Sequence, residues 1–125
     1  MYEVQVITGF AAAHLLRNYK GKCERLHGHN YKVIVTARAH AVGVSGMVMD
    51  FGDLKRAANT VADRLDHGFL NEVPPFDTIE PSAENLAYYF FQQIAAELGG
   101  DAEMLHRVSV WESDASSATY LRDAT

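Results

Sequence analysis

Alternating hydrophobic and polar positions predict strands at both ends of the chain. The first segment, Tyr2 to Phe10, is rich in Val, Ile, Tyr and Thr, which favour extended structure, and residues 11–14 can continue it. In the second segment, His29 to Ala39, the alternate apolar side chains from Tyr31 to Val35 share one face. Two later strands are predicted at Leu105 to Ser113 and Thr119 to Arg122, with a short one at Met47 to Met49.

Two segments in the middle of the chain carry apolar residues at steps of three and four, the spacing of one helical face. The first begins after Asp50, a suitable N-cap, and ends near Asp66–Gly68. The second begins after Ser82, which can also cap a helix, and Gly99–Gly100 ends it. The apolar stripes are Phe51, Leu54, Ala58, Val61 and Leu65 in the first helix, and Leu86, Phe90, Ile94 and Leu98 in the second.

The order strand, strand, helix, helix, strand, strand predicts an α+β fold. Because the helices are clustered in the middle, we expect a mostly antiparallel sheet with the helices on one face. A chain of 125 residues fits a single domain, 1–125, and no internal repeat or linker divides it.

Composition and charge mainly argue against certain classes of protein. No apolar run approaches the roughly 20 residues that a membrane span needs, and the N-terminus lacks the pattern of a signal peptide, so we expect a cytoplasmic protein without a membrane partner. The net charge of -5 argues against a nucleic-acid surface. Four of the eleven Lys and Arg residues nevertheless fall between positions 17 and 25, which indicates either a solvated turn or a patch for a small polyanion.

Two histidines separated by one glycine indicate a metal site. His27 and His29 stand at the start of the second predicted strand, where side chains two apart point to the same face. Antiparallel pairing of the first two strands, through the loop 15–26, would place His14 opposite them. Three neutral imidazoles suit zinc and leave its fourth position open for substrate or water. The alternative is a pair of surface or hydrogen-bonded histidines.

The single cysteine lies close to these histidines in the sequence. Cys23 precedes His27 by four positions, so its thiol can lie at the rim of a pocket that holds the metal. A thiolate is favoured near a metal or cationic groups, and Lys22 and Arg25 supply positive charge. The alternative is a small buried apolar residue.

Three other titratable residues are candidates for acid–base or binding roles. Asp66 and His67 stand at the end of the first helix, where a carboxylate can orient a neighbouring imidazole as an acid or base, or can simply cap the helix. Glu112 shares its parity with Val108 and Val110, which points it toward the apolar side of the sheet. There it could anchor a ligand with two adjacent N–H donors; the alternative is a solvated strand end.

Together these residues resemble the 6-pyruvoyl-tetrahydropterin synthase family nearly from end to end. Any one of the matching motifs is weak evidence, but six motifs in the order found in the family are a specific signal. The pieces are FAAAH ending at His14, CERLHGHNY from Cys23 to Tyr31, MDFGDLK from Met49 to Lys55, LDHGFLN from Leu65 to Asn71, PSAENLA from Pro81 to Ala87, and VWES from Val110 to Ser113.

The resemblance implies a fold and an assembly. It implies the tunnelling fold, or T-fold: a four-stranded antiparallel sheet with two helices on one face. In this family three subunits close their sheets into a barrel, two trimers stack as a homohexamer, and active sites lie between subunits. Closure is consistent with a physical need, because it removes exposed strand edges that would otherwise invite pairing.

The resemblance also implies roles for the candidate residues. It makes His14, His27 and His29 the zinc ligands, Cys23 the general base, Asp66 and His67 a paired relay, and Glu112 the carboxylate that holds the pterin ring. The segment Ser82–Ala83–Glu84 corresponds to a pterin-contacting Thr-Thr-Glu or Thr-Ser-Glu in relatives, so one hydroxyl is missing here. Contact of Arg25 with the triphosphate is our inference from the local charge, not part of the resemblance.

The spacing of Cys23 favours one branch of the family. The pattern C-x-x-x-H-G-H resembles the bacterial 6-carboxytetrahydropterin synthases of the queuosine pathway. This implies conversion of 7,8-dihydroneopterin triphosphate to 6-carboxytetrahydropterin, acetaldehyde and triphosphate with Zn²⁺ as cofactor. Two alternatives stay open: a 6-pyruvoyl-tetrahydropterin synthase, which eliminates triphosphate without carbon–carbon cleavage, and a non-catalytic pterin- or metal-binding protein on the same fold.

Overall fold

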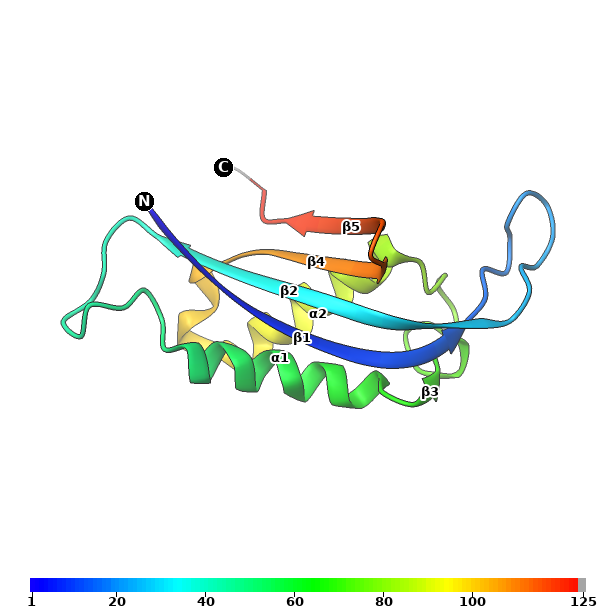
Figure 1. Cartoon of the computed structure of the whole chain (residues 1–125), viewed down its shortest axis with the longest axis horizontal. Helices are drawn as coiled ribbons and strands as arrows, with labels where there is room; N and C mark the ends of the chain where they lie inside the picture. The colour runs from blue at the N-terminus through cyan, green and yellow to red at the C-terminus, as the bar shows by residue number, and fades with distance from the viewer. Residues whose placement is uncertain (124–125) are drawn as a thin grey trace.

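The strands form one five-stranded sheet (Figure 1). In the computed structural model, which describes residues 1–123, their order is β3-β1-β2-β4-β5. Each pair is antiparallel except β1 and β3, which are parallel. The bounds are β1 Tyr2–His14, β2 His27–Ala39, β3 Gly68–Phe69, β4 Leu105–Ser113 and β5 Ser116–Leu121.

The first two strands form a long hairpin whose register decides where the histidines meet. Pairing runs without interruption from Tyr2 opposite Ala39 to His14 opposite His27. The 15–26 loop therefore lies at one end of the molecule, and the 40–49 connection lies at the other (Figure 1). This confirms the predicted pairing, and β2 begins two residues earlier than the sequence indicated.

The sheet differs from the prediction in three places, and the first is β5, which begins at Ser116 rather than Thr119 and ends at Leu121. The sheet is mostly antiparallel, as predicted, but it has five strands rather than the four antiparallel strands that the resemblance implies, because residues 68–69 add a short parallel strand to β1. The His67 N–H donates to the Ala11 carbonyl at 2.6 Å and brings the chain onto that edge. The predicted strand at Met47–Met49 is absent from the described residues. A turn takes its place, in which the Gly43 N–H donates to the Met47 carbonyl at 2.9 Å.

Two helices begin at the predicted N-caps. The Asp50 carboxylate accepts the Gly52 N–H at 2.7 Å, and the Ser82 hydroxyl accepts the Asn85 N–H at 3.2 Å. Such caps satisfy backbone donors that have no partner within the helix. The helices are α1 Phe51–Leu65 and α2 Ala83–Leu98, and two short 3₁₀ helices that the sequence did not predict follow them at Leu70–Glu72 and Gly99–Met104.

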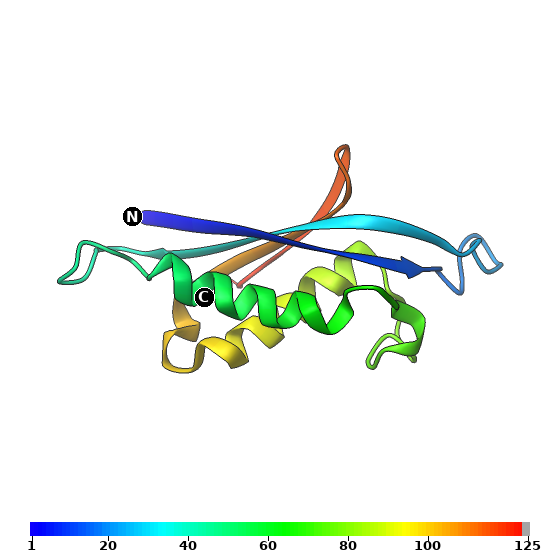
Figure 2. The ribbon, with the colours of Figure 1, turned by 60° about the horizontal axis from the view of Figure 1, so that its bottom comes forward.

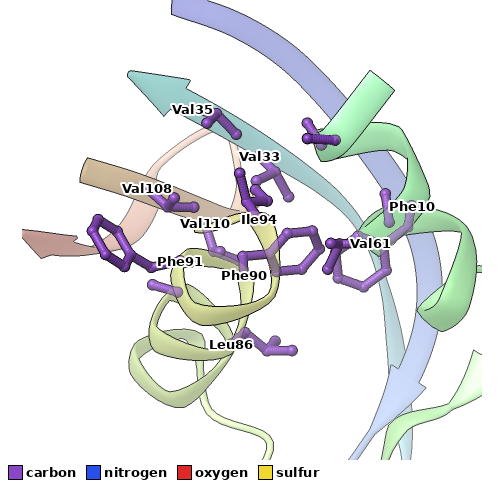
Figure 3. Close-up of a cluster of buried hydrophobic side chains, with 14 of the residues drawn as sticks. Phe10, Val33, Val35, Val61, Leu86, Phe90, Phe91, Ile94, Val108 and Val110 are labelled. Atoms are coloured by element: carbon purple, nitrogen blue, oxygen red, sulfur yellow. The ribbon is translucent and has the colours of Figure 1, made fainter. Parts of the chain in front are cut away.

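The helices cover one face of the sheet and leave the other face bare (Figure 2). Phe10 joins the layers, since its ring stacks on Tyr31 of β2 and on Phe90 of α2 with centroids 4.6 and 5.5 Å apart. Apolar side chains from both helices and from β2 and β4 surround this stack (Figure 3). Neither α1 nor α2 is long and apolar enough to cross a membrane.

Candidate active site

Three histidines converge where β1 ends and β2 begins. The Nε2 atom of His14 lies 3.1 Å from Nε2 of His27 and 3.2 Å from Nε2 of His29. His14 is buried, whereas His27 and His29 are half-buried. The register explains the cluster: His14 pairs with His27, and Ala12, two residues earlier on the same face of β1, pairs with His29.

Backbone carbonyls orient two of these rings. The Nδ1–H of His14 donates to the Pro81 carbonyl at 2.8 Å, and that of His27 donates to the Arg25 carbonyl at 2.7 Å. A carbonyl oxygen only accepts, so both rings carry their proton on Nδ1 and present a lone pair on Nε2. Metal-bound histidines are oriented in this way by their outer nitrogen.

The donor set fits zinc. Zinc–nitrogen bonds of roughly 2.0–2.1 Å in a tetrahedral site place two ligand nitrogens about 3.3 Å apart. The observed separations of 3.1 and 3.2 Å are close to that value. Three imidazoles could therefore hold a metal ion and leave a position for a further ligand.

The electrostatics of the cluster connect it to Glu112. Burial lowers the pKa of His29; the Glu112 carboxylate opposes this shift, and the imidazoles of His14 and His27 reinforce it. A lowered pKa keeps the ring neutral, as a metal ligand must be. Burial also raises the pKa of Tyr31, and the charge of Glu112 adds to that effect. The charge of Glu112 thus acts on both side chains.

Glu112 lines a pocket together with the beginning of α2. The pocket has a volume of about 250 Å³, and Ser82, Ala83 and Glu84 form part of its wall. The structure therefore brings Glu112 together with the Ser82–Ala83–Glu84 segment, which the sequence analysis singled out separately. The Ser82 hydroxyl already accepts the Asn85 N–H as the helix cap. It retains its own proton, which it can donate to a ligand.

Cys23 lies in the 15–26 loop with an exposed side chain. Its thiol donates to the Arg17 carbonyl at 3.1 Å and is not part of the histidine cluster. A tight turn at Lys20 and Gly21, both with positive φ, closes the loop on itself. The loop, and not the sheet, therefore determines the position of Cys23.

Only part of the basic loop is free to meet an anion. The Arg17 guanidinium forms an ion pair with Glu80 at 3.2 Å and donates to the carbonyls of Asn71, Phe76 and Ile79. Arg17 therefore fastens the loop to the 70–81 segment, which corrects its grouping with the candidate anion patch. The remaining cations, Lys20, Lys22 and Arg25, are exposed.

Asp66 and His67 form an ordered pair at the end of α1. The Asp66 carboxylate accepts the Ala11 N–H at 2.9 Å through Oδ1 and contacts His67 Nδ1 at 2.9 Å through Oδ2. The Ala11 N–H holds the pKa of Asp66 below its usual value, and His67 lowers it further. His67 has φ +59°, an uncommon backbone conformation that directs its ring outward, and its side chain is 85% exposed.

This pair predicts a specific loss of stability in acid. A carboxyl whose pKa is depressed by folding stabilises the protein above its unfolded pKa of about 3.9, and that contribution is lost as the pH falls through the folded pKa. Asp66→Asn should therefore lower the Tm at neutral pH and flatten its dependence on pH below about 5. Scanning calorimetry of metal-free protein, with the exposed Asp63→Asn as control, measures this. Parallel curves for parent and Asp66→Asn would contradict it.

Comparison with known proteins identifies the family. A family model described as 6-pyruvoyl tetrahydropterin synthase matches residues 3–123. The chain belongs to the 6-pyruvoyl tetrahydropterin synthase family.

Members of this family with different names resemble the chain. A relative from Archaeoglobus fulgidus, provisionally named a 6-carboxy-5,6,7,8-tetrahydropterin synthase, is 43% identical over 74% of this chain and 75% of its own length. The Synechocystis 6-carboxy-5,6,7,8-tetrahydropterin synthase is 37% identical over 89% of this chain and 86% of its own length. The structure of Caenorhabditis elegans 6-pyruvoyl tetrahydropterin synthase aligns with a TM-score of 0.87 and 30% identity, covering 98% of this chain and 96% of that one.

The similarity to this family confirms the T-fold. The structure also reveals contacts at the site that the sequence did not predict. The sequence did not predict the Arg17–Glu80 ion pair, the hydrogen bond from His14 to the Pro81 carbonyl, or the buried Tyr31 hydroxyl that has no partner within residues 1–123. The first two depend on contacts across more than 60 positions of the chain. Tyr31 had a visible signal, because it follows the two histidines on the same face of β2, but its parity alone indicates a core residue.

Proposed function

We propose that this protein is a zinc-dependent 6-carboxytetrahydropterin synthase. Its substrate would be 7,8-dihydroneopterin triphosphate, and its products 6-carboxytetrahydropterin, acetaldehyde and triphosphate, with water consumed. The three-carbon side chain of the substrate would thus yield a one-carbon carboxylate and a two-carbon aldehyde. The observation that carries the proposal is the pattern C-x-x-x-H-G-H from Cys23 to His29 in a member of this family.

In this proposal His14, His27 and His29 hold the metal. Zinc would supply Lewis-acid stabilisation of negative charge on the side-chain oxygens of the substrate. The carbonyls of Pro81 and Arg25 keep the imidazoles in the tautomer that binding requires. The half-buried position of His27 and His29 leaves the substrate access to this end of the sheet.

Proton transfer is assigned to Cys23 and to the Asp66–His67 pair. Cys23 would remove a proton from a side-chain carbon, and its exposed side chain, with the cationic Lys22 and Arg25 beside it in the sequence, suits a thiolate. Asp66 holds the Nδ1 side of His67, so Nε2 is the atom free to give or take a proton. A group of this kind typically contributes 10²–10⁴-fold to a rate.

Glu112 would bind the pterin ring. The exocyclic amine and the neighbouring ring N–H of a pterin are parallel donors, and a carboxylate can accept both, as it does from arginine. Ser82 and Glu84 line the same pocket and would contact the ring beside it. The carbonyl of Arg25 accepts the hydrogen bond from His27, and its side chain is exposed. This side chain would attract the triphosphate.

The proposed assembly is a homohexamer made of two trimers. One face of the sheet is bare (Figure 2), and within residues 1–123 neither edge of the sheet pairs with a further strand. Closure with further copies would remove these edges. The ordered but exposed Asp66–His67 pair is consistent with a site that a neighbouring subunit completes.

The products separate this function from the nearer alternative. A 6-pyruvoyl-tetrahydropterin synthase activity is supported by the fit to the Caenorhabditis elegans structure. We expect purified protein incubated with 7,8-dihydroneopterin triphosphate to release acetaldehyde and triphosphate in equal amounts, as measured by aldehyde trapping and chromatography. Triphosphate without acetaldehyde would establish the pyruvoyl reaction, and neither product would favour a non-catalytic binding protein. Boiled protein and the Cys23→Ala variant serve as controls.

A further inference from the structure

A buried hydroxyl without a partner lies beside the histidine cluster. Tyr31 is only 3% exposed, and its hydroxyl makes no hydrogen bond within residues 1–123. Buried polar groups are nearly always hydrogen-bonded, because leaving one unpaired forfeits its interaction with water. An orphaned hydroxyl next to a candidate active site therefore requires an explanation. The other orphan of this kind, the Trp111 indole nitrogen, belongs to a residue on the opposite face of the sheet.

The strand register brings Tyr31 and Glu112 to the same end of the β2–β4 pair. Val33 of β2 pairs with Val110 of β4, and both are fully buried under the helices. The pairing ends at Lys32 opposite Trp111, and the next residues along the two strands, in opposite chain directions, are Tyr31 and Glu112. A bulge between Trp111 and Ser113 interrupts the alternation of side chains at Glu112, but Glu112 lines a pocket with Ser82 and Ala83 at the beginning of α2, on the side of the sheet that the helices cover. Burial raises the pKa of Tyr31, and the charges of Glu112 and, less strongly, Glu24 raise it further.

The Tyr31 ring is held in place on several sides. It stacks on Phe10 at 4.6 Å with an interplanar angle of 10°, and it meets the edges of His29 at 5.3 Å and His14 at 5.9 Å. A ring packed in this way cannot swing out to find water. The acceptor must come to the hydroxyl. Glu112 is the suitable acceptor, because it is half-buried and accepts no hydrogen bond from residues 1–123.

We propose that Tyr31 is a positioning residue for Glu112: when a pterin fills the pocket, the Tyr31 hydroxyl donates a hydrogen bond to the Glu112 carboxylate and holds it against the ring. This inference rests on the proposed function. Without ligand, pocket water can solvate the carboxylate. A bound pterin displaces that water, and the phenol replaces it. A carboxylate has about four acceptor sites, so it can accept from the phenol and from two pterin N–H groups together.

The test uses Tyr31→Phe, which keeps the stacked ring and removes only the hydroxyl. Neopterin is the probe, and its affinity is measured by fluorescence titration of the metal-loaded protein. We expect about ten- to hundredfold weaker binding, since a hydrogen bond to a charged group is being lost. The Tm without ligand should stay the same or rise, because an unpaired buried polar group has been removed. Tyr89→Phe, a half-buried tyrosine on α2 that packs on Phe76 and Phe90, is the matched control.

A double-mutant cycle shows whether Tyr31 acts through Glu112. Glu112→Gln alone should weaken neopterin binding, and adding Tyr31→Phe to it should cause little further loss. Independent, multiplying losses would overturn the inference. A lower Tm for Tyr31→Phe would also overturn it, because the hydroxyl would then already have a partner in the free protein. If the parent binds neopterin and Tyr31→Phe binds it equally well, this inference alone fails; if the parent binds no pterin, the proposed function fails with it.

Discussion

Replacing His27 or His29 with alanine is expected to remove zinc from the protein and abolish activity. Nε2 of His14 lies 3.1 and 3.2 Å from Nε2 of His27 and of His29, the three ligand atoms all lie within 4.8 Å of one another, and each variant would leave only two donors. Loss of an outer contact to a metal ligand commonly costs 10–100-fold in affinity, so loss of a ligand should cost more than about 100-fold. Elemental analysis should find about one zinc per parent chain and nearly none in the variants.

The choice of variants keeps this test interpretable. His14 is buried and donates to the Pro81 carbonyl, so its replacement would also disturb the 70–81 segment. His27 and His29 are half-buried, and their truncation should leave the fold intact. His40, exposed in the 40–49 connection, is the control, and His40→Ala should keep full zinc and activity. Unchanged zinc in His27→Ala and His29→Ala would show that the metal site is elsewhere.

Local sequence signals predicted most of the fold. Alternation from Tyr2 and from His29 gave the long hairpin, and the caps Asp50 and Ser82 gave the starts of both helices, because each of these signals acts over a few residues. The parallel β3 strand was missed, since two residues at a turn carry no periodicity. The strand predicted at Met47–Met49 was wrong because three apolar residues in a row do not distinguish a strand from a packed turn.

The site was predictable where it depends on strand geometry. Parity and antiparallel pairing were enough to bring His14, His27 and His29 together. The position of Cys23 was not predictable, because the path of its loop depends on the Arg17–Glu80 contact, which joins residues far apart in the sequence. From charge alone, Arg17 was grouped with Arg25 in the candidate anion-binding patch. Only packing shows that its guanidinium already has partners.

The Asp66–His67 pair could belong to the active site of its own chain or to that of a neighbouring subunit. Ala11 fixes both residues, through its N–H to the Asp66 carboxylate and its carbonyl to the His67 N–H. The His67 side chain is held by Asp66 but is 85% exposed, which is consistent with a contact that a neighbouring subunit supplies. Under the proposed assembly, the pair would act on substrate held by the histidines and Cys23 of a neighbouring subunit.

Mixing two inactive variants tests this arrangement. Cys23→Ala and His67→Ala should each reduce kcat by about 10²–10⁴-fold while retaining zinc, because neither side chain belongs to the histidine cluster. If Cys23 and His67 of one site come from different chains, unfolding and refolding an equimolar mixture should restore about a quarter of the parent activity, since random assembly gives about one site in four both intact residues. Mixing Cys23→Ala with the double variant Cys23→Ala/His67→Ala should restore none. If native mass spectrometry shows mixed oligomers but activity does not return, each site uses residues of one chain, and the exposed position of His67 must serve another purpose.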